Sequence, residues 1–180
     1  ETNMFNEYYD YKLGLENEHS VGIGGIIVHH GVAPSTIMAI ALSFYGIALL
    51  LGIYICAMSS WWIAAVGLVC MLIGYLYTGG PYSIAYSPFG ELVSGTVMGM
   101  GIVLIAFFIQ TKTVTLEAVL LSVPSMILVG AIMLSNNIRD IVGDTEGGRK
   151  TMAILVGRHN AVYILSLFFI VSYLWIVGLV

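Results

Sequence analysis

Long apolar runs dominate this chain and restrict the folds open to it. Five segments are long enough and apolar enough to cross a membrane, and they cover residues 34–58, 59–77, 91–110, 114–135 and 160–180. A helix of about 20 apolar residues spans the hydrocarbon core of a bilayer. Apolar types make up 59% of the 180 residues and charged types only 9%, which does not fit a soluble domain with an ordinary polar surface. The chain is therefore expected to be a membrane protein.

The spanning segments are predicted to be helices rather than strands. A transmembrane strand alternates polar and apolar residues, whereas residues 37–58 and 116–134 are almost continuously apolar. The expected fold is an all-α, polytopic transmembrane helical bundle that forms a single membrane domain over residues 1–180. Because no start signal opens the chain and residues 160–180 are apolar to the last position, we expect a fragment with about five full spans.

The charged residues predict the orientation of this bundle. If each segment crosses the bilayer once, the connections 1–33, 78–90 and 136–159 lie on one side. Five of the six basic residues fall there, namely Lys12, Arg139, Arg149, Lys150 and Arg158. Positively charged connections stay in the cytoplasm, so we predict that these three are cytoplasmic in a protein of the cell membrane. Nine of the ten acids lie on the same side, with Glu117 the exception.

Two short acidic segments lie where apolar spans meet water. In one of them Asn136, Asp140 and Asp144 recur every four residues, which places them on one face of a helix. The other has Glu7 and Asp10 one turn apart. Hard oxygen ligands suit Mg²⁺, which usually binds a few carboxylates together with substrate phosphates. The predicted metal ligands are Glu7, Asp10, Asp140 and Asp144.

Basic and amide side chains beside these acids predict a diphosphate site. Arginine binds phosphate oxygens in a bidentate way, and lysine acts as a point charge. The predicted diphosphate-binding residues are Asn6, Lys12, Asn136, Arg139, Arg149 and Lys150. For any one of these residues, an ordinary ion pair or helix cap at the membrane surface is an equally good explanation. Taken together, the two acidic segments favour a metal-and-phosphate site.

Two nonenzymatic functions are alternatives to this site. A transporter or channel usually carries ionisable residues in the middle of its spans, and the cores of the five predicted spans have none. Cations beside the carboxylates also argue against a simple acidic cation pore. A binder of lipid head groups would explain the basic residues but not the paired carboxylates.

Three further features predict local structure. Pro124 lies in the middle of a predicted span, where proline kinks a helix. Gly95 and Gly99 form a pair of small residues four apart, which is typical of close helix packing. Tyrosines including Tyr75 and Tyr86 gather around the glycine-proline connection. They are either an aromatic belt at the membrane interface or part of the lining of a substrate cavity.

The two acidic segments resemble the motifs of a known family. Residues 6–10 and 136–144 are similar to the two aspartate-rich motifs of the UbiA superfamily of intramembrane aromatic prenyltransferases. Residues 20–25, 77–86 and 147–151 resemble the branch that acts on 1,4-dihydroxy-2-naphthoate in menaquinone synthesis. The resemblance covers nearly all of the chain. It implies the central part of a nine-helix bundle, from the end of the second helix to the seventh.

The resemblance also implies a reaction. The family transfers a polyprenyl group from its diphosphate to an aromatic ring, and in this branch the ring carboxylate is lost as CO₂ to give demethylmenaquinone. The implied partners are polyprenyl diphosphate, an aromatic acceptor and the lipid bilayer, with no nucleic acid. Another acceptor such as 4-hydroxybenzoate stays open, because no motif residue identifies the ring. Asp140 and Asp144 are the expected catalytic residues, and Asp140 is the candidate for removing the ring proton.

The first motif departs from the superfamily pattern at two positions. Glu7 stands where the pattern has aspartate, which keeps a carboxylate on a longer arm. Gly14 stands where the pattern has a third acid. Metal binding by this motif is therefore expected from Glu7 and Asp10, with Glu16 or Glu18 as further candidates.

Overall fold

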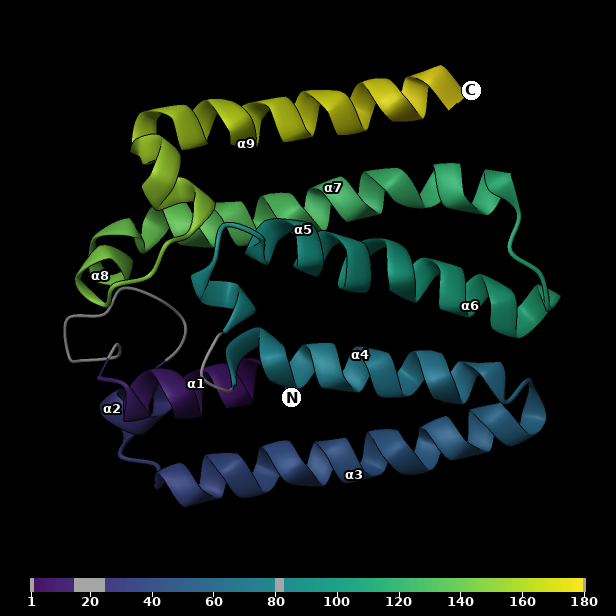
Figure 1. The fold of residues 1–180 in the computed structure, drawn as a ribbon, viewed down its shortest axis with the longest axis horizontal. Coiled ribbons are helices and arrows are strands. Elements are labelled where there is room, and N and C mark those ends of the chain that lie inside the picture. The colour runs from purple at the N-terminus through teal and green to yellow at the C-terminus, as the bar shows by residue number, and fades with distance from the viewer. Residues whose placement is uncertain (1, 15–24, 80–82, 180) are drawn as a thin grey trace. The chain divides into compact units, whose positions relative to one another are not determined.

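The computed structural model describes residues 2–14, 25–79 and 83–179, and these residues form helices joined by short connections (Figure 1). The chain divides into two compact units. Unit one comprises Glu1–Tyr86 and Val142–Gly148, and unit two comprises Ser87–Ile141 and Arg149–Val180. The candidate ligands Glu16 and Glu18 lie outside the described residues. So do residues 20–24 and 80–82, which belong to the segments that resemble the family. The all-helical prediction is confirmed.

Unit one is built on a short helix that packs against two long ones. Its elements are α1 (Thr2–Lys12), α2 (Ile26–His30), α3 (Pro34–Met58), α4 (Trp62–Thr78) and the 3₁₀ turn η1 (Ile84–Tyr86). Phe5 of α1 is 3% exposed. Its ring meets Tyr45 of α3 and Tyr75 of α4 edge to face, with ring centroids 5.5 and 6.0 Å apart. These contacts attach α1, which carries the first acidic motif, to both long helices.

Unit two contains three long helical segments. The first is continuous and consists of α5 (Gly90–Ser94), the π-helical segment η2 (Gly95–Gly101) and α6 (Ile102–Thr111). It is followed by α7 (Leu116–Arg139) and α9 (Met152–Leu179). The short helix α8 (Ile141–Glu146) comes between them in the sequence, but all of it except Ile141 belongs to unit one. In α9 the helix is interrupted at Gly157, where φ is +79° and ψ is 152°. Only glycine adopts this conformation readily, so the break separates a first short turn from the long apolar part.

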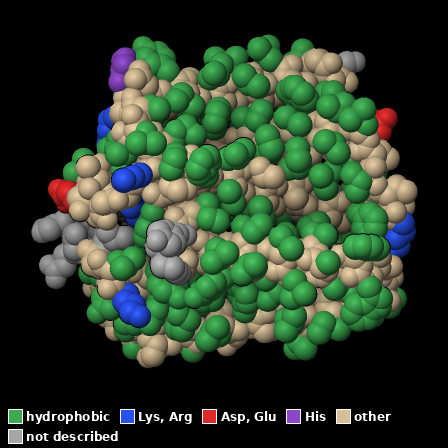
Figure 2. All heavy atoms as spheres, in the orientation of Figure 1, with side chains coloured by type: hydrophobic (Ala, Val, Ile, Leu, Met, Phe, Trp, Pro, Cys, Tyr) green, Lys and Arg blue, Asp and Glu red, His purple; other side chains and the backbone are tan. Residues whose placement is uncertain are grey.

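The membrane character expected from the sequence is confirmed. Four helical segments are long and apolar enough to span a membrane, namely Pro34–Met58, Gly90–Thr111, Leu116–Arg139 and Met152–Leu179. The segment predicted at 59–77 forms α4, whose 17 residues are near the lower limit for a spanning helix. Large apolar side chains such as Leu50 and Leu174 are 69% and 65% exposed. Apolar side chains also cover most of the face in Figure 2. The chain belongs to a multi-pass membrane protein.

Two glycines bring η2 into backbone contact with α7, as the small-residue pair predicted. A Cβ added to Gly99 would lie 2.5 Å from the carbonyl oxygen of Ser125 and 2.6 Å from Cα of Met126. A Cβ on Gly95 would collide with the carbonyl oxygen of Met126. Any side chain at either position therefore has to push the two helices apart.

Pro124 leaves a carbonyl group in α7 without its usual partner, and α9 supplies a replacement. Proline has no N–H, so the Leu120 carbonyl four residues earlier receives no bond from it. The indole Nε1–H of Trp175 donates to this oxygen at 2.9 Å. Because hydrocarbon offers no water to satisfy a backbone carbonyl, this bond stabilises the proline-containing helix and joins α7 to α9.

Replacing Trp175 by phenylalanine is expected to lower the stability of the protein modestly. The change keeps an aromatic ring but removes the only donor of the indole, so the Leu120 carbonyl loses this bond. The expected loss is about 0.6 kcal/mol, the average for such bonds in membrane proteins. Thermal unfolding in detergent measures it, with Trp62→Phe as the control because the Trp62 side chain is exposed. Equal unfolding temperatures for the two variants would show that the indole bond contributes nothing.

Candidate functional site

Asp10 is a buried carboxylate of the first motif that other side chains hold in place. It is 7% exposed and lies on α1. Asn6, one turn earlier, donates from Nδ2 to Oδ2 of Asp10 at 3.1 Å, and the Tyr86 hydroxyl donates to Oδ1 at 2.6 Å. The helical spacing predicts the first of these contacts, but not the second, because Tyr86 lies 76 residues further along the chain. The two donors orient the carboxylate, as outer-shell partners of metal ligands usually do.

Glu7 holds the beginning of α2. Its carboxylate is 8% exposed and accepts the backbone N–H of Gly25 at 2.9 Å and that of Ile27 at 3.0 Å. A carboxylate at the N-terminus of a helix satisfies N–H groups that have no partner within the helix. Glu7 therefore has a structural contact in addition to its predicted role. An ionised carboxylate offers about four lone-pair sites, so these two bonds leave it able to bind a metal ion.

A pair of tyrosines lies beside this motif. The hydroxyl groups of Tyr9 and Tyr75 are 3.3 Å apart. This hydrogen bond, together with partial burial, raises the pKa of Tyr9 to about 12. Tyr9 is therefore a protonated phenol at neutral pH. Tyr75 and Tyr86, two of the tyrosines that the sequence singled out, both make hydrogen bonds to side chains of α1.

The second motif is divided between two helices. The regular helix ends at Arg139, and Asp140 is its C-cap, with a backbone N–H that donates to the Asn136 carbonyl at 3.0 Å. The side chain of Arg139 donates from Nε and Nη2 to the two carboxylate oxygens of Asp140, both at 2.7 Å. These side chains are 42% and 34% exposed, so the pair lies at the surface of unit two. The i, i+4 face expected over residues 136–144 does not continue through this break.

The other predicted site residues differ in exposure. Asp144 lies on α8, is 6% exposed and belongs to the same compact unit as Glu7 and Asp10, whereas Asp140 belongs to unit two. The exposed ones are Lys12, Asn136 and Lys150, and Arg149 is half-buried. Within residues 2–14, 25–79 and 83–179, no three His, Cys, Asp or Glu side chains form a ready metal site. The donor set is nonetheless all oxygen, and its buried members are carboxylates, which fits a hard divalent cation.

Glu91 is a buried acid that the sequence analysis did not single out. It lies in the first turn of α5 and is 2% exposed. Asn137 of the second motif donates from Nδ2 to Glu91 Oε1 at 2.9 Å and is itself 8% exposed, whereas its neighbour Asn136 is exposed. The one feature of the sequence that could have indicated Glu91 is its place as a carboxylate at the very start of a long apolar span. Such an acid is costly in a membrane unless it has a partner.

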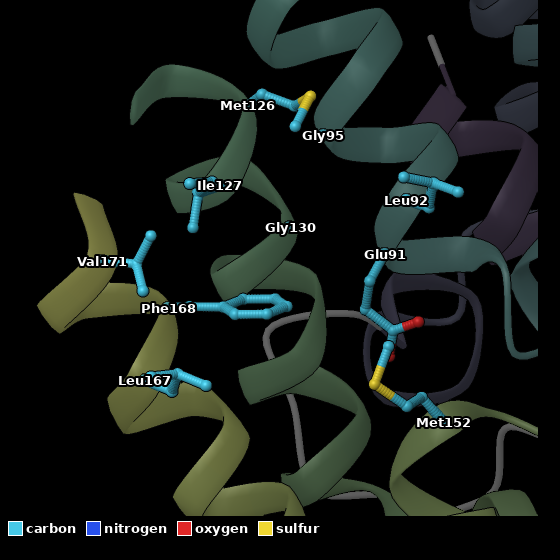
Figure 3. Close-up of a pocket in the computed structure, with 10 residues that line it drawn as sticks. All are labelled: Glu91, Leu92, Gly95, Met126, Ile127, Gly130, Met152, Leu167, Phe168 and Val171. Atoms are coloured by element: carbon cyan, nitrogen blue, oxygen red, sulfur yellow. The ribbon is translucent and has the colours of Figure 1, made fainter. Parts of the chain in front are cut away.

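Glu91 also lines a cavity of about 340 Å³ within unit two. The cavity lies between α5, η2, α7 and α9, and Figure 3 shows Ile127 and Phe168 among its apolar lining residues. Glu91 is the one charged residue in this lining, and Figure 3 shows it with apolar lining residues such as Leu92 and Met152. The cavity therefore suits an apolar group better than an ionic one.

Comparison with known proteins relates these features to one family. The sequence model of the UbiA prenyltransferase family matches residues 2–180. The chain is 63% identical to 1,4-dihydroxy-2-naphthoate octaprenyltransferase of Bacillus subtilis, over 99% of this chain and 58% of the relative. It is 28% identical to the protein of the same name from Mycobacterium tuberculosis, over 86% and 53%. It is 26% identical to human UbiA prenyltransferase domain-containing protein 1, over 86% and 46%.

The chain thus spans about half the length of these relatives. No solved structure matches it.

Proposed function

The chain belongs to the UbiA prenyltransferase family, and we propose that its protein transfers a polyprenyl group from its diphosphate to 1,4-dihydroxy-2-naphthoate. The products would be the quinol form of demethylmenaquinone, CO₂ and diphosphate, and a separate two-electron oxidation would give demethylmenaquinone. The observation that carries the proposal is the 63% identity to the Bacillus subtilis octaprenyltransferase over 99% of the chain. Family membership favours this enzyme over the transporter and the lipid-binding protein.

The first part of the mechanism is the binding of the diphosphate. Enzymes of this family generally depend on a divalent metal, and we propose Mg²⁺. The residues that would hold it are Glu7, Asp10, Asp140 and Asp144. A bound Mg²⁺ would neutralise the charge that develops on the departing diphosphate. Tyr86 and Asn6 would keep the Asp10 carboxylate in place through the bonds described above. Lys12, Asn136, Arg149 and Lys150 would bind diphosphate oxygens.

Arg139 would take part by changing partners. Its bond to Asp140 is exposed to solvent, and an exposed ion pair contributes only about 0–1 kcal/mol. A diphosphate can therefore compete for the guanidinium, which binds phosphate oxygens in the same bidentate geometry. Release of Asp140 would leave its carboxylate available to help hold the metal.

The apolar spans provide the second part of the mechanism. A polyprenyl chain is hydrocarbon, and the helices of both units present mainly apolar side chains (Figure 2). Water must be kept from the allylic cation until the ring attacks it, and a site among membrane helices excludes water. We propose that the protein lies in the cell membrane, with connections 1–33, 78–90 and 136–159 in the cytoplasm, where the diphosphate is supplied.

A competition between acceptors tests this function. The full-length protein in membranes with Mg²⁺ and a polyprenyl diphosphate is offered 1,4-dihydroxy-2-naphthoate and 4-hydroxybenzoate together, and the products are identified by mass. The expected product is the prenylated naphthoquinol that has lost the mass of CO₂. Prenylation of 4-hydroxybenzoate alone would contradict the proposed acceptor but would still support a prenyl transfer reaction. Transfer to neither ring would overturn the proposed activity.

A further inference from the structure

We propose that Glu91 is a positioning residue for the second acidic motif. Its buried carboxylate holds Asn137 in the last turn of α7 and so determines where the neighbouring Asp140 carboxylate is presented. The effect on transfer rests on the function proposed above, whereas the effect on metal binding can be measured without it. Glu91 would act through Asn137 and would not touch the substrate.

The bond between these side chains is buried and charge-assisted. Glu91 and Asn137 are 2% and 8% exposed, and Nδ2 of Asn137 lies 2.9 Å from Oε1 of Glu91. Within the described part of the chain, Oε2 of Glu91 has no hydrogen-bond partner, so this amide is the one polar contact of the carboxylate. Bonds to an ionised acceptor are about twice as strong as neutral ones, and removing one partner leaves the other buried without a bond.

The backbone near Glu91 makes the connection to α7 rigid. The carbonyl oxygen of Glu91 lies 3.2 Å from the position of a Cβ on Gly130, which is two turns before Asn137 on the same helix. The first turn of α5 therefore contacts α7 by backbone approach at Gly130 and by a side-chain bond at Asn137. A helix held at two points on one face has little freedom to rotate about its axis there.

The held turn leads directly to the motif carboxylate. Asn137 lies two residues before the end of α7, and the Asp140 N–H closes that turn by donating to the Asn136 carbonyl at 3.0 Å. Rotation of the last turn would move Asp140 with it. The two adjacent amides then have different functions: Asn137 holds the helix from inside, and the exposed Asn136 stays available to diphosphate.

The choice of a carboxylate also points to function rather than packing. A buried acid at the start of an apolar span is expensive, and intramembrane acids usually mark functional sites. Partners in the second shell of metal ligands typically change metal affinity or activity by about 10–100-fold when removed. Glu91 contacts Asn137 rather than one of the proposed metal ligands. We therefore expect an effect near the lower end of that range.

The test measures metal binding and catalysis on the full-length protein. The variants are Glu91→Leu, Glu91→Gln, Asn137→Leu and the double variant Glu91→Leu/Asn137→Leu. Mn²⁺ binding is followed by electron paramagnetic resonance, prenyl transfer is followed against Mg²⁺ concentration, and unfolding temperature is recorded for each variant. Ser122→Ala is the control, because Ser122 is fully buried in α7 and its hydroxyl donates to the Val119 carbonyl, in the half of the helix away from Asn137.

Glu91→Leu is expected to weaken Mn²⁺ binding about tenfold and to raise the half-saturating Mg²⁺ concentration similarly. Glu91→Gln keeps an oxygen that accepts from Asn137 but loses the charge, so its Mn²⁺ affinity should lie between those of wild type and Glu91→Leu. The double variant should be no worse than either leucine variant, because all three lose the same interaction. Ser122→Ala should leave Mn²⁺ binding unchanged.

Three results would overturn the proposal. The first is wild-type Mn²⁺ affinity in Glu91→Leu despite a lower unfolding temperature, which would make the bond purely structural. The second is additive losses in the double variant. The third result applies if Glu91→Leu fails to accumulate in the membrane: Asn137→Leu would then bind Mn²⁺ with wild-type affinity. Absence of prenyl transfer by the wild-type protein would overturn the proposed function instead, and the Mn²⁺ measurements would still decide the role of Glu91.

Discussion

Asp144→Asn in the full-length protein is expected to reduce prenyl transfer by at least ~10²-fold, the usual cost of removing a group that stabilises charge in the transition state. Asparagine keeps the size of the side chain and one acceptor oxygen but removes the charge that attracts a divalent cation. Because Asp144 is 6% exposed, solvent cannot replace that charge. The same loss is expected for Asp140→Asn. Initial rates at saturating polyprenyl diphosphate over a range of Mg²⁺ concentrations measure both.

Glu117→Gln is the matched control for these two variants. Glu117 is also an acid in the C-terminal half of the chain, but it is exposed and lies in the first turn of α7, at the opposite end of that helix from the second motif. Its removal should leave the rate unchanged. If Asp140→Asn and Asp144→Asn both turned over at the wild-type rate, the metal-and-diphosphate site would have to lie elsewhere.

Gly99→Ala is expected to destabilise the protein by about 1–3 kcal/mol, the usual cost of forcing an extra methyl group into a well-packed interface. The new Cβ would lie 2.5 Å from a backbone oxygen and 2.6 Å from Cα of the facing helix. Backbone atoms in a hydrogen-bonded helix cannot move aside as a flexible side chain can, so η2 and α7 must separate. A lower unfolding temperature in detergent reports the loss.

Gly67→Ala provides the comparison for this glycine. Gly67 lies inside α4, another apolar helix, and a Cβ there would meet nothing within 4 Å. Alanine is a better helix former than glycine, so this variant should unfold no earlier than wild type. Equal unfolding temperatures for Gly99→Ala and wild type would show that the helices are not in the close contact described.

Much of the fold follows from local sequence patterns. Continuous apolar runs predict spanning helices, because a membrane requires each segment to satisfy its own backbone hydrogen bonds. Small residues at Gly95 and Gly99 predict close helix packing, and the structure shows that the partner is α7. The main difference between the predicted and the observed fold lies in residues 136–159. The sequence predicts a connection there, whereas the structure has the end of α7, the helix α8 and the start of α9. Its Gly and charged residues favour a loop in isolation, and the sequence offers no strong apolar period to indicate these short helices.

The candidate site follows from the sequence only where its contacts are local. The Asn6 to Asp10 bond joins residues one helical turn apart, and helix geometry alone predicts it. The bond from Tyr86 to Asp10 joins residues 76 apart, and the bond from Asn137 to Glu91 joins residues 46 apart. No periodicity connects residues on different elements, so sequence patterns cannot predict such partners.

By itself, the sequence determines that this chain is a multi-helix membrane protein with acidic motifs at the ends of its spans. Segment length, hydrophobicity and helical spacing are local properties, and they suffice for this. The tertiary structure decides which polar group meets which. It assigns Glu7 to the start of α2, Trp175 to the carbonyl freed by Pro124, and Glu91 to Asn137. Buried polar groups must find partners wherever packing brings them, and packing depends on the whole chain.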